Sequence, residues 1–101
     1  MHDLHDALFR VNTERKRFEL ELENYTAFAE YIMNNDNIVF VTHTEVPSEL
    51  EGKGVGSRLI SLALTWIKEK GYTLAPLCPF TAAYVKRHPE WKEILAPGYH
   101  V

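Results

Sequence analysis

The segment 46–59, VPSELEGKGVGSRL, has residue types and a spacing that could bind an anion. Gly52, Gly54 and Gly56 alternate here between an apolar run and a helical pattern. Because glycine has no Cβ, its backbone can adopt positive φ and a ligand can approach its amides closely. The first N–H groups of a helix lack intrahelical partners, and the helix dipole favours negative charge at that end. The segment therefore predicts an anion cradle, most often one for phosphate.

The other residues of this loop leave two interpretations open. Lys53 and Arg58 favour an anion, whereas Glu51 opposes one. A dinucleotide fingerprint would need glycine where Ser57 stands, and a Walker loop would need its lysine after the second glycine. On these residues alone, a structural turn explains the loop as well as a ligand site does.

Cys78 is the only cysteine, so it has no partner for an intrachain disulfide. It directly precedes a predicted helix with Pro79 at the first position, where proline is well tolerated. A thiol is nucleophilic as the thiolate, and a helix amino end lowers its pKa from about 8.5. A small buried core residue is an equally good interpretation from context alone.

His43 is a candidate base or thiolate partner, because an unperturbed histidine has a pKa near ~6.5. A histidine held by hydrogen bonds at a strand end is the alternative. Alternation places His43 and Glu45 on one face of their strand. Thr44 and Val46 then lie on the other face, and the sequence does not decide which face meets a ligand.

Periodic apolar residues predict the elements that must position these groups. We expect five strands and two helices, the strands at 8–11, 17–23, 25–33, 38–46 and 72–77, the helices at 57–70 and 80–88. The second strand alternates strictly, with Phe18 and Leu20 on one face and the glutamates, Glu19 among them, on the other. Such alternation is typical of a half-buried antiparallel strand.

Three details of this assignment depend on single residues. The segment 25–33 is rich in aromatic residues, but its alanines also allow a helix. Gly71 ends the long helix, since glycine is favoured just past a helix carboxyl end. Pro89 ends the second helix, and Trp91 begins a last apolar turn.

This order of elements predicts an α+β fold, an antiparallel meander covered by one main helix. The connection from 38–46 through the long helix to 72–77 is a crossover, so these two strands should run parallel. Their carboxyl ends then lie near each other and near the start of the helix. The topology therefore brings Cys78 into the neighbourhood of the glycine loop.

The composition indicates a globular chain with one domain over 101 residues. We expect a loose leader at 1–7, which contains His2 and His5, and a tail at 96–101. The net charge of −3 argues against nucleic-acid binding, and no apolar run is long enough to span a bilayer. The single cysteine fits a cytoplasmic location, and no pair of His or Cys has the spacing of a metal site.

At the level of motifs, the chain resembles the GCN5-related N-acetyltransferases. The family's pyrophosphate pattern, Arg/Gln-x-x-Gly-x-Gly/Ala, falls on Glu51, Gly54 and Gly56, with Glu51 departing from it. HTEVPSELEGKGVGSRL together with PLCPFTAAYVKRHPEW is similar to the small, single-domain, cysteine-containing branch. The likeness covers about 17–95.

The resemblance implies acetyl-coenzyme A as the ligand. Its pyrophosphate would lie on the loop amides, and its pantetheine arm would follow the strand that ends at Val46; the cradle would comprise Gly52, Lys53, Gly54, Val55, Gly56 and Ser57. Cys78 stands where this branch is proposed to carry the acetyl group. Tyr84 could protonate the leaving thiol or pack in the core. Arg87 could meet the nucleotide phosphates or be a solvated charge at a helix end.

Three functions remain open from the sequence. The first is an acetyl-CoA-dependent N-acetyltransferase acting on an unidentified amine. Because few residues remain to form an acceptor pocket, that acceptor would be a macromolecule or a dimer would complete the site. The second is a CoA-binding module without catalysis, and the third is a small interaction domain whose glycine loop is only a turn.

Overall fold

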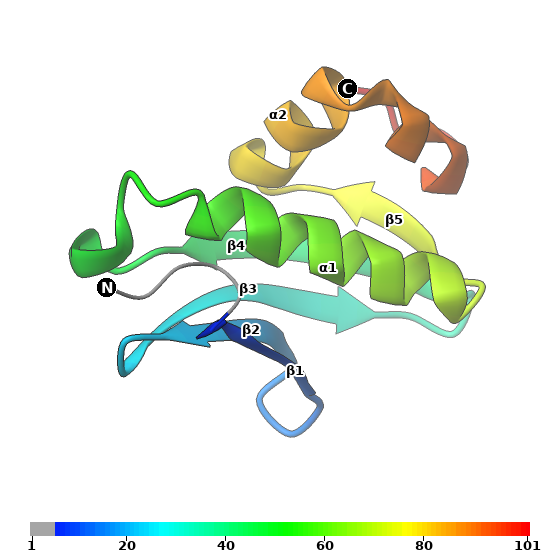
Figure 1. Ribbon diagram of the computed structural model, residues 1–101. Helices are drawn as coiled ribbons and strands as arrows, with labels where there is room; N and C mark the ends of the chain where they lie inside the picture. Colours follow the sequence, from blue (N-terminus) through cyan, green and yellow to red (C-terminus); the bar gives the residue numbers. More distant parts are fainter. Residues whose placement is uncertain (1–5) are drawn as a thin grey trace.

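The structure, a computed structural model, describes residues 6–101. His2, His5 and most of the expected leader lie outside this range. Five strands form one sheet in the order β1-β2-β3-β4-β5: β1 Leu8–Asn12, β2 Arg17–Leu22, β3 Tyr25–Met33, β4 Ile38–Glu45 and β5 Thr73–Pro76. The first three junctions are antiparallel, and β4 pairs with β5 in parallel. The predicted α+β meander with a parallel pair is confirmed (Figure 1).

The helices follow the predicted order with shifted ends. They are α1 Val55–Glu69 and α2 Pro79–Arg87, with short 3-10 turns η2 Ser48–Leu50 and η3 Pro89–Ile94. α1 begins two residues before the predicted start because Gly54, at φ 75°, takes the left-handed conformation and is its N-cap. Gly71 ends α1 as predicted, also with a φ of 75°. The ambiguous segment 25–33 is strand β3, and its alanines Ala27 and Ala29 are buried.

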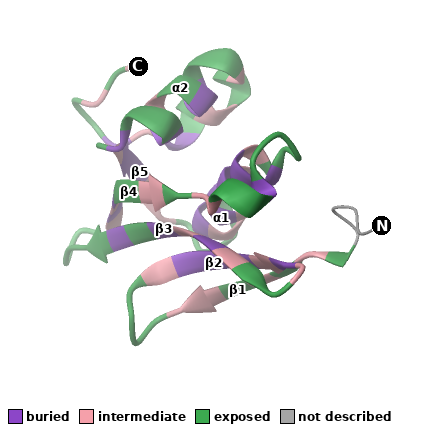
Figure 2. Ribbon diagram, turned by 90° about the vertical axis from the view of Figure 1, so that its left-hand side faces the viewer, coloured by how far each residue is buried: buried purple, intermediate pink, exposed green. Residues whose placement is uncertain are grey.

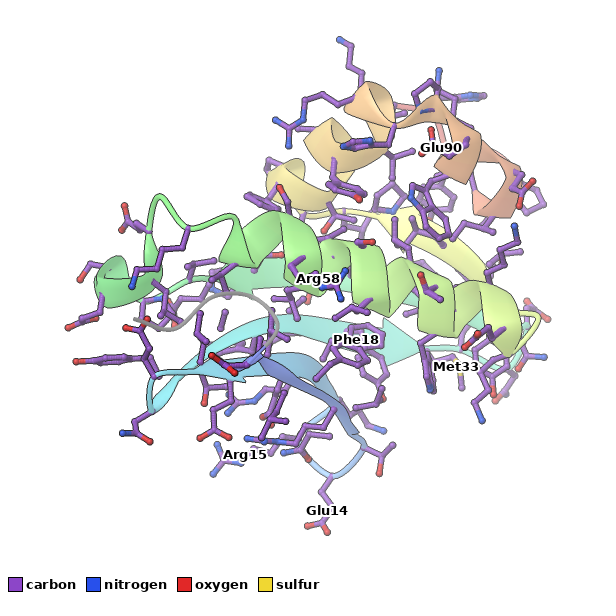
Figure 3. The ribbon with its side chains drawn as sticks, viewed as in Figure 1. Glu14, Arg15, Phe18, Met33, Arg58 and Glu90 are labelled. Carbon is purple, nitrogen blue, oxygen red and sulfur yellow. The ribbon has the colours of Figure 1, made fainter. Side chains whose placement is uncertain are left out.

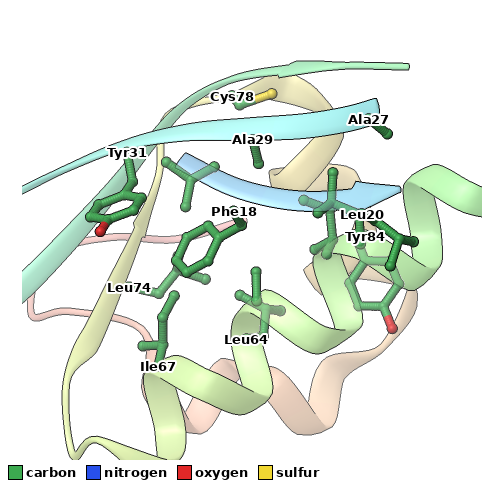
Figure 4. Packing of buried hydrophobic residues seen from close by; sticks show 14 of the residues in the cluster. Phe18, Leu20, Ala27, Ala29, Tyr31, Leu64, Ile67, Leu74, Cys78 and Tyr84 are labelled. Carbon is green, nitrogen blue, oxygen red and sulfur yellow. The ribbon is translucent and has the colours of Figure 1, made fainter. Parts of the chain in front are cut away.

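α1 covers one face of the sheet and forms the core with it. Figure 2 shows buried residues gathered between α1 and the strands, and Figure 3 shows Phe18 between β2 and α1. Phe18 is fully buried and its ring packs against Tyr31 and Trp66, with ring centroids 4.7 and 5.6 Å away. Leu64 and Ile67 of α1 approach the same ring from below (Figure 4). The apolar periodicity of both elements is therefore explained by a single shared core.

No described helix covers the middle of the opposite face of the sheet, which we call the uncovered face (Figure 2). Its residues, by strand register, include Arg10, Glu19, Phe28, Glu30, His43 and Glu45. The expected tail 96–101 does not leave the sheet entirely, because the Ala96 amide donates to the Leu74 carbonyl at 2.8 Å. The Tyr99 ring also contacts Phe40 edge-on.

Glu19 lies on the uncovered face, but it is buried, with only 2% of its surface exposed. Alternation places Glu19 on the face opposite Phe18, as predicted, and its burial there arises because neighbouring strands supply side chains that cover it. Arg10 and Arg17 bind its two carboxylate oxygens, and Asn12 donates at 3.2 Å. The Arg17 guanidinium also lies 4.3 Å from the centroid of the Phe28 ring. A charged cluster therefore closes this side of β2.

This cluster predicts a defined pH dependence of stability. Burial raises the pKa of Glu19, but hydrogen bonds from Arg17, Arg10 and Asn12 lower it more, so the net pKa lies below its ordinary value of 4.5. Its contribution to stability is therefore complete above pH 4.5 and is lost as the pH falls through the folded-state pKa. Glu19→Gln should cost about 1–3 kcal/mol at pH 7. The cost should shrink as the pH falls from 4.5.

The measurement is the urea midpoint of wild type and Glu19→Gln between pH 7 and pH 3. Glu14→Gln, at an exposed turn residue, is the matched control and should follow wild type throughout. A constant difference between wild type and Glu19→Gln over this range would contradict the linkage.

Candidate active site

A β-bulge in β4 sets which side chains reach the site. Tyr31 pairs with Val41 but Glu30 pairs with His43, so Thr42 has no opposite residue. The extra residue reverses the alternation, and Thr44, opposite the buried Ala29, shares the α1 side with Val41. His43 is thereby turned to the uncovered face. The bulge, which no sequence signal indicated, thus decides the face that Thr44 and His43 occupy.

The parallel strands β4 and β5 separate next to this bulge. Their pairing ends at Val41 and Pro76, and the Cys78 amide still donates to the Val41 carbonyl at 2.9 Å. Beyond Val41, β4 continues to Glu45 with no backbone partner among residues 6–101 on the edge that faces β5. Unpaired strand groups at this edge are open to hydrogen bonds from an extended ligand.

Cys78 lies where the two strands separate, as the N-cap residue of α2. It is buried, and its thiol donates to the Thr44 hydroxyl at 3.3 Å. Burial raises the pKa of Cys78, but the Thr44 hydroxyl and the backbone amides of Thr81 and Phe80 lower it more, so the net pKa is lowered. These donors can stabilise a thiolate at the amino end of α2.

The Thr81 hydroxyl adds to this environment. Thr81 is fully buried, and its Oγ1 is the one buried side-chain oxygen or nitrogen in the described chain without a hydrogen-bond partner. It acts on the pKa of Cys78 in the same direction as the amides, by favouring the thiolate. An unpaired buried donor is costly, and a negative sulfur would give it an acceptor.

We therefore expect Thr81→Val to separate stability from thiol reactivity. Removing an unpartnered buried hydroxyl should change the free energy of unfolding by less than about 1 kcal/mol, or even stabilise the fold. The pKa of Cys78 should nevertheless rise, because one donor to the thiolate is lost. The pH profile of alkylation by iodoacetamide measures it, and Thr65→Val on α1 is the control. An unchanged profile would exclude Thr81 from the site.

The glycine loop forms the wall of a cleft of about 280 Å³. The lining residues are Val46, Leu50, Glu51, Gly52, Gly54, Val55, Gly56, Ser57 and Phe80. The first helical hydrogen bond of α1 runs from the Arg58 amide to the Gly54 carbonyl, and no side chain caps this helix. The amides of 55–57 are therefore free to bind an anion. The structure brings the predicted cradle residues together, Lys53 excepted.

The side chain of Lys53 does not line this cleft. Its ammonium group binds both carboxylate oxygens of Glu23, at 3.0 and 3.2 Å, in the turn between β2 and β3. Glu51 does line the cleft, and no lysine or arginine of the described chain does. The cleft can therefore hold an anion chiefly through backbone amides and the helix dipole.

The remaining predicted residues lie apart from Cys78. His43 is exposed on the uncovered face, 3.7 Å from Glu45 and with its ring 6.3 Å from that of Phe28. Tyr84 is buried in the core with its ring 4.4 Å from His88, and its hydroxyl points away from Cys78 in Figure 4. Arg87 is exposed at the last residue of α2, the far end from Cys78.

Sequence reasoning missed three residues that the structure places here. Thr81 stands three positions after Cys78, the spacing of an N-cap residue and the amide that it binds, and this signal could have revealed it. Thr44 depends on the bulge, and Phe80 depends on packing between helices. Neither has a local sequence signal.

Two absences complete the description. Within residues 6–101, no helix is long and apolar enough to cross a bilayer. In the same range, no three acidic, histidine or cysteine side chains gather as a metal site would need.

The chain matches the family described as GCN5-related N-acetyl-transferase over residues 17–94, and it belongs to that family. Membership indicates an acetyltransferase, and acetyl-CoA is the acetyl donor typical of the family.

Two individual proteins are similar to this chain. Protein NATD1 of Mus musculus is 29% identical over 90 residues, which cover 83% of this chain and 80% of that protein. The NMR solution structure of a Staphylococcus aureus protein described as GCN5-like has a TM-score of 0.69 at 22% identity. The superposition covers 99% of this chain and 95% of the Staphylococcus aureus chain. This second likeness supports the fold.

Proposed function

We propose that this protein is an acetyl-CoA-dependent N-acetyltransferase that carries the acetyl group on Cys78. The observation that carries the proposal is the setting of the thiol. It is a buried N-cap sulfur that contacts the Thr44 hydroxyl, with an unpartnered Thr81 hydroxyl beside it. A structural cysteine would need none of these donors. Each of them favours the thiolate, which is the nucleophilic form.

The residues present fit coenzyme A. The free amides of 55–57 and the positive-φ glycines Gly52 and Gly54 suit a pyrophosphate, which binds backbone donors at a helix amino end. Val46 lines the same cleft and follows the unpaired edge of β4, which suits the amide groups of a pantetheine arm. When bound, the cofactor supplies an acetyl thioester.

The chain's part in the reaction is a thiol exchange followed by transfer. The Cys78 thiolate attacks the acetyl carbonyl carbon; a new C–S bond forms at Sγ, and the bond to the coenzyme A sulfur breaks. The departing thiolate takes a proton from solvent. An amine then attacks the acetyl-Cys78 carbonyl, a C–N bond forms, and Cys78 leaves as the thiolate while the nitrogen loses its proton.

The acceptor is an amine, and its nitrogen loses one proton as the C–N bond forms. His43 lies on the uncovered face, opposite Thr44 and the thiol, so it takes no part in this proposal, and the amine proton passes to solvent. Tyr84 and Arg87 take no part in this proposal, because one is in the core and the other is at the far end of α2. A CoA-binding module without transfer is the second candidate, favoured by the burial of Cys78, which leaves the thiol little access to an acetyl group.

Intact-protein mass after mixing with a small excess of acetyl-CoA tests the proposal. Wild type should gain one acetyl group, and Cys78→Ala should gain none. Hydroxylamine at neutral pH should remove the added mass, as expected of a thioester. CoA binding without any mass gain in wild type would favour the binding module and contradict transfer through Cys78.

A further inference from the structure

Where the two helices meet, the ring of Phe80 in α2 packs over Gly56 of α1. A Cβ built on Gly56 would lie 2.7 Å from Cζ and 3.3 Å from Cε2 of that ring. It would also lie 3.3 Å from Cγ2 of Val46. Contacts below 3.0 Å essentially do not occur, so any side chain at 56 would displace the ring.

Backbone conformation does not explain this glycine. Gly56 is the second residue of α1 and does not share the positive φ of Gly52 and Gly54. Alanine is more favourable than glycine inside a helix by about 1 kcal/mol, so conformation alone would favour alanine here. The ring of Phe80 supplies the physical reason for glycine at this position.

Phe80 also connects the two halves of the site. Its ring lines the cleft of the glycine loop and is 38% exposed, although it packs onto a buried glycine. Its backbone is in the first turn of α2, two residues after Cys78. One residue therefore contacts the start of α1 through its ring and belongs to the turn that surrounds the thiol.

We propose that Phe80 is a positioning residue whose ring, seated on Gly56, fixes the amino end of α2 and the Cys78 thiol against the glycine cradle. The packing of Phe80 on Gly56 does not depend on the proposed function. The expected effect of this packing on acetyl transfer does rest on the proposed function. A side chain at 56 would push the Phe80 ring away from α1. The ring would then either enter the cleft or shift together with the first turn of α2. Because this ring contacts the cradle and its backbone belongs to the turn around Cys78, the cradle and the thiol would both be disturbed.

The first experiment is a stability cycle without any cofactor. Gly56→Ala should lower the melting temperature by several degrees in the wild-type background, since the methyl group clashes with the ring. In the Phe80→Ala background the same change should cost much less or raise the melting temperature, because the 2.7 Å clash is gone and only the milder 3.3 Å contact with Cγ2 of Val46 opposes the helix preference for alanine. A change of the same sign and size in both backgrounds would overturn the proposed contact.

The second experiment measures the thiol itself, through the pH profile of Cys78 alkylation by iodoacetamide. Phe80→Ala and Gly56→Ala should each slow alkylation at pH 7 at least about threefold, because the donors in the first turn of α2 shift from the sulfur. Adding Gly56→Ala to Phe80→Ala should slow it no further. Phe80→Leu should restore most of the rate. If Phe80 only stabilised the fold, the pH profile of Cys78 alkylation would be the same in the variants as in wild type. That result would contradict the proposal.

Leu77→Ala is the matched control, since Leu77 adjoins Cys78, is 53% exposed and does not line the cleft. Its alkylation profile should match wild type. Titration with CoA then separates the two proposals. Gly56→Ala should weaken CoA at least about tenfold, and the double variant should recover most of that loss. If wild type binds no CoA, the proposed function fails, whereas the stability cycle and the alkylation profile still decide the role of Phe80.

Discussion

Cys78→Ser should lower kcat/KM for amine acetylation by at least about a thousandfold, whereas the affinity for CoA should stay within about twofold of wild type. Serine keeps the shape of the side chain and can still hydrogen-bond to Thr44. Its hydroxyl, however, ionises far above neutral pH, so the donors of α2 cannot generate a comparable nucleophile. The cradle amides at 55–57 are untouched, which is why binding should persist.

Steady-state rates of free CoA release with a panel of amines, together with calorimetric titration of CoA, provide this measurement. Leu77→Ala serves again as the neighbouring control. A loss of less than about tenfold would mean that the amine attacks the bound thioester directly, with Cys78 only lining the site. That result would exclude an obligatory acetyl-cysteine intermediate.

Phe18→Ala should reduce the free energy of unfolding by about 3–5 kcal/mol, the range found for truncating a buried aromatic side chain. Phe18 is fully buried, and its ring packs against Phe9, Tyr31 and Trp66. These three residues come from β1, β3 and α1, so the cavity cannot close by moving one element. The loss should appear as a lower midpoint in urea with little change in slope.

Ile32→Ala is the control for that prediction, because Ile32 is an apolar residue of the same sheet but is 60% exposed. It should cost no more than about 0.5 kcal/mol. If Phe18→Ala cost as little as Ile32→Ala, the core described between β2 and α1 would be wrong.

Much of the arrangement around the site could be predicted from local patterns. Alternation over β2 and helical spacing over α1 identify the elements, and Gly71 and Pro79 locate two of their ends. The rule that a crossover connection joins parallel strands then requires the carboxyl ends of β4 and β5 to meet. For that reason the sequence was enough to predict Cys78 near the glycine loop.

The chemistry of the site depends on contacts between residues far apart in the chain. Thr44 reaches the thiol because a bulge reverses the alternation of β4, and Lys53 is held by Glu23 in the turn between β2 and β3. Glu19 is buried by side chains of the neighbouring strands, and Gly56 is glycine because of Phe80. Periodicity in the sequence records which face of an element is apolar, and it carries no information on register or on side chains from other elements. The sequence alone therefore determined the topology and the position of the cysteine, whereas the tertiary structure decided the environment of the thiol.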